Sequence, residues 1–367
     1  MITYIEIKRF KSINELSIDL KPINILIGSN GVGKSNFISF FKLVGAIFNR
    51  NLQRYIMDEK VDNILYFGMK RSESLYGKMI FDSEKGNNNA YFFELVVDKY
   101  GGMFISKEGS GFNVNKDDDN HNYFRDLNLL ESKIPTSTAF RDNFLRFHLK
   151  HLQIFHFHDT SSTSFLRRAS DINDNLFLRQ DGRNLPAFLY FLKEKHKKIY
   201  SRIVKTIQSV APYIHDFILE PKLLNHDEIE IRWVDSGDLE SSFSAYQLSD
   251  GTLRFIALAT LLMQPNPPSV IIIDEPELGL HPFAIGKLAG LIKLAATKSQ
   301  IILATQSPGM VSHFKPDDII VMNKNKEQNQ TTFGRLDPEE LKPWLEEYSL
   351  GELWQRNNFD SAQPFIK

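Results

Sequence analysis

The sequence of 367 residues contains no cysteine. This absence excludes disulfide bonds, thiolate catalysis and cysteine-ligated zinc sites, and it fits a reducing compartment. Runs of about 18 uninterrupted apolar residues, which a membrane-spanning helix requires, are also missing, as is the apolar core of a signal peptide near the first residue. We therefore expect a cytoplasmic protein without a membrane partner.

An excess of charge of one sign is missing as well. The chain has 44 lysines and arginines against 45 aspartates and glutamates, so its formal net charge is −1. This balance excludes a global positive field of the kind that attracts nucleic acid, although it allows a local basic patch. Heptad runs and internal repeats are absent, which excludes a coiled-coil arm and a solenoid. An apolar content of 42% is that of a soluble globular protein with one elaborated domain or two lobes.

A phosphate-binding motif occupies residues 23–36. Ile23–Ile27 predicts a buried strand, Gly28-x-x-x-x-Gly33-Lys34-Ser35 matches the P-loop, and the amphipathic run 36–57 predicts the helix that should follow. In a P-loop, backbone N–H groups and the amino end of the helix surround the β-phosphate, the lysine meets the β- and γ-phosphate oxygens, and the serine ligates Mg²⁺. Since chance produces this pattern in roughly one chain of this length in a hundred, we predict a nucleotide site formed by Gly28, Ser29, Asn30, Gly31, Val32, Gly33, Lys34, Ser35 and Asn36, with ATP and Mg²⁺ as its ligands.

A second strand predicts the acidic half of this site. The apolar run 269–273 ends in Asp274 and Glu275, and ligands of parallel sheets lie at the carboxyl ends of the strands. Asp274 would hold Mg²⁺ through water, and Glu275 would polarise the attacking water. A surface turn is the alternative, which the upstream P-loop disfavours.

A third motif lies between these two. Residues 248–254 read Leu-Ser-Asp-Gly-Thr-Leu-Arg and precede an apolar helical run, 255–263. Here the chain resembles the ABC-type ATPases, including their RecF/SMC-like branch, whose signature motif is Leu-Ser-Gly-Gly-Gln. The resemblance implies that Ser249 and the Gly251 amide cap the γ-phosphate held by the P-loop of another protomer, and helix amino ends do attract phosphate. An ordinary serine N-cap is the alternative.

The resemblance extends to the segments around these motifs. Residues 277–282 resemble the D-loop region, and the buried strand 300–304 leads to Gln306, where ABC ATPases place their switch histidine. A glutamine there can contact the γ-phosphate or position water, but it cannot titrate. Neither the first predicted helix, which holds Gln53, nor residues 66–68 supply a convincing Q-loop. RecF/SMC-like relatives also imply that Arg9 touches the nucleotide, with a surface turn as the alternative.

The resemblance is strongest to stand-alone bacterial ABC-type ATPases related to RecF/SMC and the OLD proteins, and it rests additionally on residues 155–160, 181–185, 247–254 and 348–354. Members of this group often occur in phage-defence or abortive-infection operons beside a small effector protein. The resemblance therefore implies a homodimer or higher homo-oligomer and a separate effector protein. We expect no TOPRIM domain of the kind found in OLD nucleases, because few residues follow the predicted ATPase.

Taken together, the patterns predict an α/β P-loop NTPase of the ABC/RecF-like type with an antiparallel β lobe and a mixed helical insertion. The amino-terminal ATPase half would occupy residues 1–139 and include a meander of strands at 77–81, 91–97 and 103–106. The mainly helical insertion would occupy 140–235, and the carboxyl-terminal ATPase half would occupy 236–367.

Two further features leave alternatives open. His156 and His158 would share one face of a strand beside Asp159, as metal ligands or as a hydrogen-bonded pair. The basic run 193–205 is either a solvated helix face or a contact for the DNA or RNA backbone.

We predict slow ATP hydrolysis, with Lys34, Glu275 and Gln306 as the catalytic residues. An ATP-gated head-to-tail dimer would control an effector or nucleic-acid partner in anti-phage defence. A RecF-like DNA-maintenance ATPase, a transporter subunit and a non-hydrolysing scaffold are the rivals.

Overall fold

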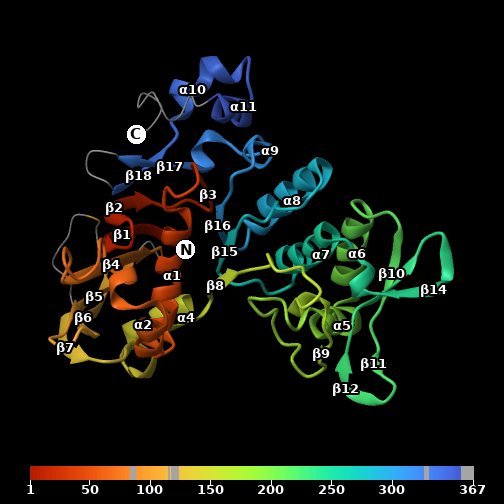
Figure 1. Ribbon diagram of the computed structural model, residues 1–367, viewed down its shortest axis with the longest axis horizontal. Helices are drawn as coiled ribbons and strands as arrows, with labels where there is room; N and C mark the ends of the chain where they lie inside the picture. The colour runs from red at the N-terminus through yellow and green to blue at the C-terminus, as the bar shows by residue number, and fades with distance from the viewer. Residues whose placement is uncertain (83–87, 115, 117–123, 326–329, 357–367) are drawn as a thin grey trace.

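The computed structural model describes residues 1–82, 88–114, 116, 124–325 and 330–356. Two six-stranded sheets form the body of the molecule, and two three-stranded sheets lie at one end (Figure 1). No helix among these residues combines the length and the apolar character that crossing a bilayer requires. The arrangement is the predicted mixed α/β fold with a separate antiparallel lobe.

The central sheet carries the predicted P-loop strand. Its order is β18-β17-β3-β16-β15-β8, with parallel pairing from β17 to β8 and an antiparallel β18 at the edge. Successive residues of β3 enter separate apolar cores on the two faces of the sheet, Ile25 on one face and Leu26 on the other. The reason is that successive side chains of a strand point in opposite directions. The strands are β3 Ile23–Ile27, β8 Leu152–Phe155, β15 Val270–Asp274, β16 Gln300–Ala304, β17 Ile319–Asn325 and β18 Gln330–Arg335.

The antiparallel sheet has the order β2-β1-β4-β5-β6-β7 and packs with α1 against one face of the central sheet (Figure 1). The three predicted meander strands are confirmed as β4, β5 and β6, whereas β7 was not predicted. The elements of this lobe are β1 Ile2–Phe10, β2 Ile13–Asp19, α1 Lys34–Phe48, α2 Leu52–Glu59, α3 Val61–Ile64, β4 Ser74–Phe81, β5 Asn89–Val97, β6 Met103–Phe112, β7 Phe124–Leu129, the 3₁₀ helix η1 Ile134–Thr136 and α4 Phe140–Lys150.

The prediction of a single helix over residues 36–57 is wrong. The polar turn 49–51, in which Arg50 adopts a φ of +57°, separates two helices, α1 and α2. A left-handed residue of this kind ends a helix, because the right-handed hydrogen-bond ladder cannot continue through it.

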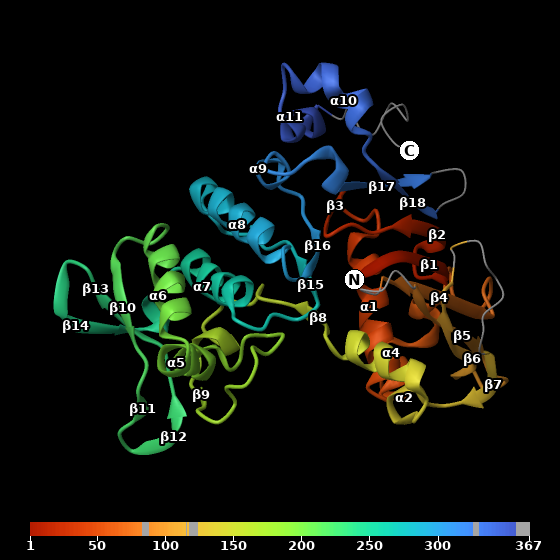
Figure 2. The same cartoon turned by 180° about the vertical axis from the view of Figure 1, so that it is seen from behind.

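Helices cover the other face of the central sheet. In Figure 2, α7 and α8 lie beside β15 and β16, and α5 and α6 lie farther out. These helices are α5 Leu185–Lys195, α6 Lys197–Gln208, α7 Asp250–Met263 and α8 Pro282–Ala295, followed by α9 Pro308–Val311, α10 Pro338–Leu345 and α11 Leu350–Gln355. The 3₁₀ helices η2 Phe165–Arg167, η3 Ala245–Gln247 and η4 Pro316–Asp318 lie in the connections.

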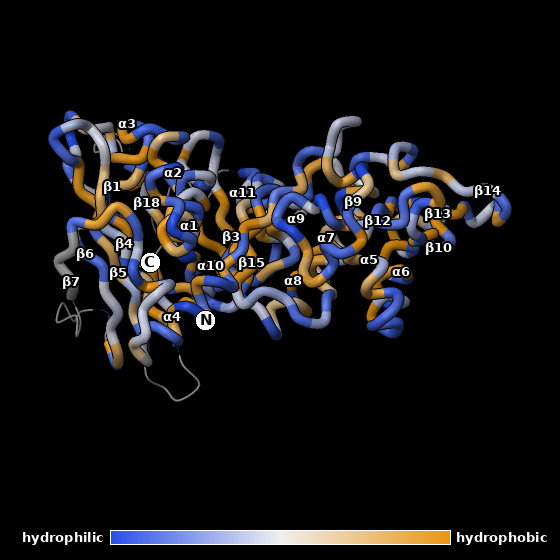
Figure 3. Tube along the Cα trace, turned by 90° about the horizontal axis from the view of Figure 1, so that it is seen from below, coloured by the Kyte–Doolittle hydropathy of each residue, from blue (hydrophilic) through white to orange (hydrophobic). Residues whose placement is uncertain are grey.

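Two small sheets form the end of the helical lobe. Their orders are β10-β13-β14 and β11-β12-β9, and Figure 3 shows β14 extending away from the central sheet. Their strands are β9 Ser170–Asp171, β10 Ile214–Ile218, β11 Pro221–Lys222, β12 Asn225–Ile229, β13 Arg232–Asp235 and β14 Asp238–Ser244. The division of the chain at residues 140 and 236 remains a prediction, although β8, which falls in the predicted insertion, is a strand of the central sheet.

Candidate nucleotide-binding site

The loop between β3 and α1 is a cradle that only glycine can form at two positions. Gly28 has a φ of +155°, and a Cβ atom there would lie 2.4 Å from the Met322 carbonyl oxygen. Gly33, with a φ of +111°, would place a Cβ atom 2.6 Å from Ser12 Oγ and 2.7 Å from Thr331 Oγ1. The loop therefore needs both the left-handed backbone and the missing side chain. Its remaining residues, Ser29, Asn30, Gly31 and Val32, follow the same turn into α1.

Lys34 lies at the start of α1 with its ammonium group turned into this loop. The side chain is buried, and Nζ donates to the carbonyl oxygens of Gly28 at 2.6 Å and Ser29 at 3.1 Å. Burial lowers the pKa of Lys34, whereas the charges of Glu275 and Asp274 act in the opposite direction. A buried cation held by loop carbonyls fits a phosphate group, whose oxygens would take the place of those acceptors.

The acidic residues predicted from sequence lie next to this lysine. Asp274 ends β15, and burial raises its pKa while the charge of Lys34 lowers it. The backbone N–H of Glu275 donates to the Ala304 oxygen of β16 at 2.8 Å, and Glu275 has a φ of +38°, which is unusual for a residue other than glycine. Strained residues of this kind concentrate at functional sites.

Gln306 contacts the carboxylate of Glu275. Its side-chain Nε2 donates to Glu275 Oε1, which fixes the orientation of the carboxylate. The sequence placed both residues at strand ends, but their direct contact was not predicted. Ser35, in the first turn of α1, is exposed, and Asp274 is half-buried. Both oxygens suit Mg²⁺, and their role as its ligands stays a prediction.

A series of side-chain hydrogen bonds supports the P-loop, and two of its members, Ser12 and Thr331, were not predicted from the sequence. Asn36 Nδ2 donates to Ser12 Oγ at 2.8 Å, Ser12 contacts Thr331 Oγ1 at 2.8 Å, and Thr331 donates to the Val32 carbonyl at 2.7 Å. Thr331 belongs to β18, about as far from the P-loop in sequence as the chain allows, and no local pattern marks it.

Glu277 is a further buried acid in the site. Thr305 Oγ1 donates to its Oε1 atom, the backbone N–H of Gln306 lies 3.4 Å from the same atom, and burial raises the pKa of Glu277. Its second oxygen, Oε2, is buried without a hydrogen-bond partner among the described residues. Glu277 thus links the turn after β15 to the end of β16, and the D-loop resemblance did not indicate this role.

The signature-like motif begins α7. Ser249 is the N-cap, and its Oγ accepts from the Thr252 N–H at 3.2 Å. This contact fits both interpretations of the motif, so the γ-phosphate role of Ser249 stays a prediction. Ser249 is exposed, which leaves it accessible to a second molecule. A Cβ atom on Gly251 would lie 2.4 Å from the Gly279 carbonyl oxygen, so this glycine lets α7 touch the turn that follows β15.

The unusual Asp250 of this motif has a buried partner. Arg167 Nη2 donates to Asp250 Oδ1 at 2.7 Å, and its Nη1 donates to the carbonyl oxygens of Ala245 and Leu248 at 2.6 and 3.1 Å. Arg167 therefore holds the loop that presents Ser249. The sequence patterns did not indicate this role.

Arg9 and Gln53 have different surroundings. Arg9 is a half-buried residue of strand β1, so the surface-turn alternative is wrong, whereas its contact with a nucleotide stays a prediction. It has a φ of +59°, and its Nε atom is buried without a hydrogen-bond partner among the described residues. Gln53 belongs to α2, and its Nε2 donates to the carbonyl oxygens of Met103 and Leu130 at 3.0 Å each. Those contacts attach α2 to the antiparallel sheet and do not form a Q-loop.

The paired histidines lie beside the central sheet. The His156 and His158 ring centroids are 6.3 Å apart, and burial lowers the pKa of His156 to about 4. Within the described ranges, no group of three histidine, aspartate or glutamate residues is arranged to hold a metal ion. In the basic run 193–205, Lys193 donates to the Phe217 carbonyl at 3.0 Å, whereas Lys195, Lys197 and Lys198 are exposed.

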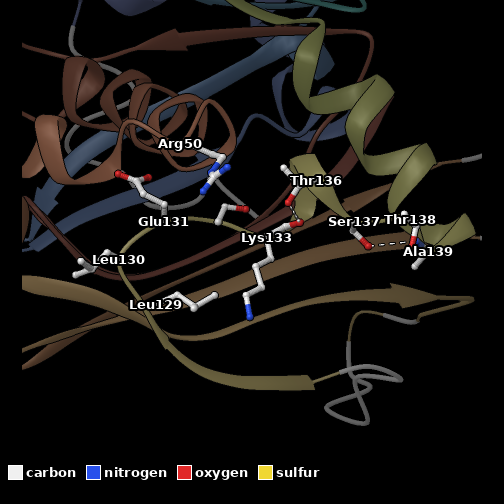
Figure 4. A pocket seen from close by; sticks show the side chains of 10 residues that line it. Arg50, Leu129, Leu130, Glu131, Lys133, Thr136, Ser137, Thr138 and Ala139 are labelled. Atoms are coloured by element: carbon white, nitrogen blue, oxygen red, sulfur yellow. Dashed lines mark hydrogen bonds between the residues drawn. The ribbon is translucent and has the colours of Figure 1, made fainter.

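A separate pocket lies on the antiparallel lobe (Figure 4). Its volume is about 760 Å³, and its lining includes Arg50, Glu131 and Lys133. The Glu131 carboxylate accepts from the backbone N–H groups of Leu52 and Gln53 at 3.0 and 3.1 Å, so it is already used to cap α2. None of the predicted nucleotide-site residues lines this pocket.

Solved structures with a similar fold are SMC heads. An SMC head bound to the C-terminal winged-helix domain of ScpA has a TM-score of 0.57 at 17% identity, over 92% of this chain and 98% of that chain. An SMC head with an extended coiled coil, bound to the C-terminal domain of ScpA from Pyrococcus furiosus, has a TM-score of 0.56 at 15% identity, over 94% and 98%. At these identities the similarity establishes the fold alone.

Curated relatives match a smaller part of the chain. The energy-coupling factor transporter ATP-binding protein EcfA2 of Staphylococcus aureus (strain bovine RF122 / ET3-1) is 33% identical over 107 residues, which are 28% of this chain and 36% of the relative. EcfA2 of Staphylococcus epidermidis (strain ATCC 35984) is 36% identical over 85 residues, 23% of this chain and 29% of the relative. The chain thus spans about a third of the length of these relatives.

The family match is longer. Residues 23–312, which contain the P-loop, the start of α7, β15 and β16, match the family described as "AAA domain, putative AbiEii toxin, Type IV TA system". Because the match covers most of the chain and the fold is that of SMC heads, the protein belongs to the AAA_21 family and has the P-loop ATPase fold of ABC- and SMC-type proteins.

Proposed function

We propose that this protein binds and slowly hydrolyses ATP, and that ATP closes two copies into a head-to-tail dimer. The observation that carries this proposal is the placement of three residues. Lys34 and Glu275 follow strands of one sheet and interact through their charges, whereas Ser249 begins a helix packed on the opposite face of that sheet from α1. A second copy whose Ser249 covers the P-loop would complete the site, and two-fold symmetry would create two such sites.

Within one copy, the residues divide the work of phosphoryl transfer. Lys34 would exchange the carbonyl oxygens of the loop for the β- and γ-phosphate oxygens. Mg²⁺, held by Ser35 and through water by Asp274, would neutralise phosphate charge. Glu275, oriented by Gln306, would position and polarise the attacking water.

The second copy would supply electrostatic stabilisation. Ser249 and the Gly251 amide lie at the amino end of the 14-residue helix α7, where the aligned backbone dipoles favour a phosphate. Arg167 holds the preceding loop in place, so this end of the helix is positioned before nucleotide arrives.

We assign this switch to bacterial anti-phage defence, with a separate effector protein as its partner in the cytoplasm. The family description names a toxin of a toxin–antitoxin system, and the similar SMC heads are bound to domains of ScpA. A protein partner is favoured over DNA because the net charge of −1 gives no general attraction to phosphate.

The test is the solution mass of the Glu275→Gln protein with and without Mg-ATP. Removing the carboxylate should leave ATP bound and unhydrolysed, so the mass should double with ATP. Lys34→Ala in the same background is the control and should stay at the mass without ATP. A mass that ignores ATP would contradict the dimer switch, and a wild-type protein without measurable turnover would contradict hydrolysis.

A further inference from the structure

The hairpin of β11 and β12 carries two leucines where a turn does not need them. Lys222 pairs with Asn225, so Leu223 and Leu224 form a two-residue loop, and they are 85% and 98% exposed. Two-residue hairpin loops favour glycine, asparagine and aspartate. The neighbouring β13–β14 hairpin follows this rule, since its loop of the same length is Ser236-Gly237. The leucines therefore require a reason other than the turn.

The stretch of chain that forms this hairpin and the neighbouring β13–β14 hairpin is acidic. Residues 216–240 contain eight aspartates and glutamates but only two lysines and arginines, a formal charge of −6 in a chain whose total is −1. One of the two cations, Lys222, is paired with Glu228 at 2.9 Å and Glu230 at 3.8 Å. Such a surface repels nucleic acid and anionic lipid and attracts a basic protein surface.

The hairpin is connected to the signature-like motif through hydrogen bonds. Strand β12 pairs with β9, in the register Glu228 with Asp171 and Ile229 with Ser170. Three residues before β9, the side chain of Arg167 holds Asp250 at the start of α7. A partner bound to the hairpin would therefore contact a strand that is hydrogen-bonded to β9, and β9 follows closely after Arg167, which positions the loop of Ser249.

We propose that the β11–β12 hairpin is the docking element for a basic partner protein, whose apolar pocket, rimmed by lysines or arginines, takes Leu223 and Leu224. This inference rests on the proposed function in that the partner is the separate effector. Apolar side chains that enter a desolvated pocket carry most of the energy of an interface, while the surrounding charges steer the approach.

The test starts with a photo-crosslinking amino acid placed at Leu223 in the full chain, in the native host. Tyr100 is the control position, since it is also 85% exposed but lies on the antiparallel lobe. The protein crosslinked from position 223 and not from position 100 is identified, purified and titrated against three forms of this chain: wild type, Leu223→Ser/Leu224→Ser and Tyr100→Ser.

We expect the double serine variant to bind this partner at least about 30-fold more weakly than wild type, and the Tyr100→Ser protein to bind normally. Affinity should also fall roughly tenfold between ~0.1 and ~0.5 M salt, because the attraction is between opposite charges. The proposal would be overturned if the double variant bound the partner as well as wild type, or if the partner surface were acidic. It would also be overturned if Leu223 crosslinked only to nucleic acid or to a second copy, or gave no product beyond those of the Tyr100 control.

The outcome can be separated from that of the dimer switch. The double serine variant in the Glu275→Gln background should still double its mass with ATP, because the hairpin contributes no residue to the nucleotide site. If the double serine variant loses the partner but still doubles its mass with ATP, the docking role of the hairpin is supported. If the leucines bind the partner but ATP never changes the mass, only the dimer switch is overturned.

Discussion

At the scale of single residues, the nucleotide site depends on side chains that the motifs do not contain. The chain Asn36–Ser12–Thr331 ends on the Val32 carbonyl, and each step is a side-chain hydrogen bond to a different element. Arg167 serves the signature-like loop in the same way. The motif residues supply the chemistry, and these neighbours fix where that chemistry takes place.

Thr331→Val should weaken ATP binding more than it weakens the fold. The valine keeps the shape but leaves the Val32 carbonyl without its donor, a loss of about 1–2 kcal/mol. Because the lost hydrogen bond supports the P-loop, we expect the loss to appear in the free energy of ATP binding. There it corresponds to a decrease in ATP affinity of roughly 5- to 30-fold, which titration calorimetry would measure. Thr332→Val is the matched control, because Thr332 donates to the Asn323 carbonyl, away from the loop. Equal affinities of the two variants would contradict this role of Thr331.

The motif residues were predictable because each motif is local, and their partners were not because contact depends on the fold. Gly28 to Ser35 are adjacent in sequence, so a spacing rule finds them. Asp250 looked like a departure from the signature, and its reason lies 83 residues earlier in a buried arginine. A single sequence contains no signal that joins such a pair.

At the scale of elements, the buried strands were the most predictable. The apolar runs at β3, β15 and β16 are confirmed because a strand covered on both faces must be mostly apolar. The small strands β9 and β14 and the edge strand β18 were missed. They are short or only half-buried, and they exist because of partners distant in the chain, so their local sequence carries little periodicity.

The contact between α7 and the turn after β15 predicts opposite effects for one substitution at two helical glycines. Gly251→Ala would place a methyl group 2.4 Å from the Gly279 carbonyl oxygen, so α7 must shift, at a cost of about 1–3 kcal/mol. Gly290→Ala, in α8, meets nothing within 4 Å and should stabilise the protein by roughly 0.5–1 kcal/mol. Urea unfolding would measure both, and a Gly251→Ala protein as stable as wild type would contradict the close contact.

At the scale of the whole molecule, the central sheet separates two apolar cores, and two half-buried histidines lie near it. Burial lowers the pKa of His148 and of His156 to about 4 each, from an ordinary value of 6.5. Between these values the unfolded chain binds more protons than the folded chain, so the free energy of unfolding should fall as the pH drops from 6.5 to 4. Because both side chains are partly exposed and water screens their charge, we expect a decrease on the order of 1–2 kcal/mol for each histidine, less than the full shift would give.

Replacing His148 should flatten this pH dependence. The centroid of the His148 ring lies 4.2 Å from that of Phe144 and 5.4 Å from that of Phe81. His148→Phe retains an aromatic ring at this position but removes the proton-binding group. Urea unfolding at pH 4.5 and pH 7 should then show a smaller difference than in wild type, whereas His226→Phe, at an exposed position, should keep the full difference. A difference unchanged by His148→Phe would mean that His148 does not contribute to the acid sensitivity.

The proposed composite site makes a quantitative prediction for mixed dimers. Lys34→Ala disables the P-loop of one copy, and Ser249→Arg disables the helix end that would cover the other copy's nucleotide. Each variant alone has two defective sites in its dimer. In a mixed dimer both defects meet in one site, and the second site combines an intact Lys34 with an intact Ser249. Only a mixed dimer contains an intact site, so an equal mixture should recover ATPase activity that neither variant shows alone. The recovery should reach at most about half of wild type, if every copy enters a mixed dimer and the two sites act independently. Mixing each variant with Lys34→Ala/Ser249→Arg is the control and should yield no recovery, because every site then lacks a functional residue. An inactive mixture of the two single variants, with mixed dimers demonstrated by differential tags, would place Ser249 in the same site as its own Lys34 and contradict the head-to-tail arrangement.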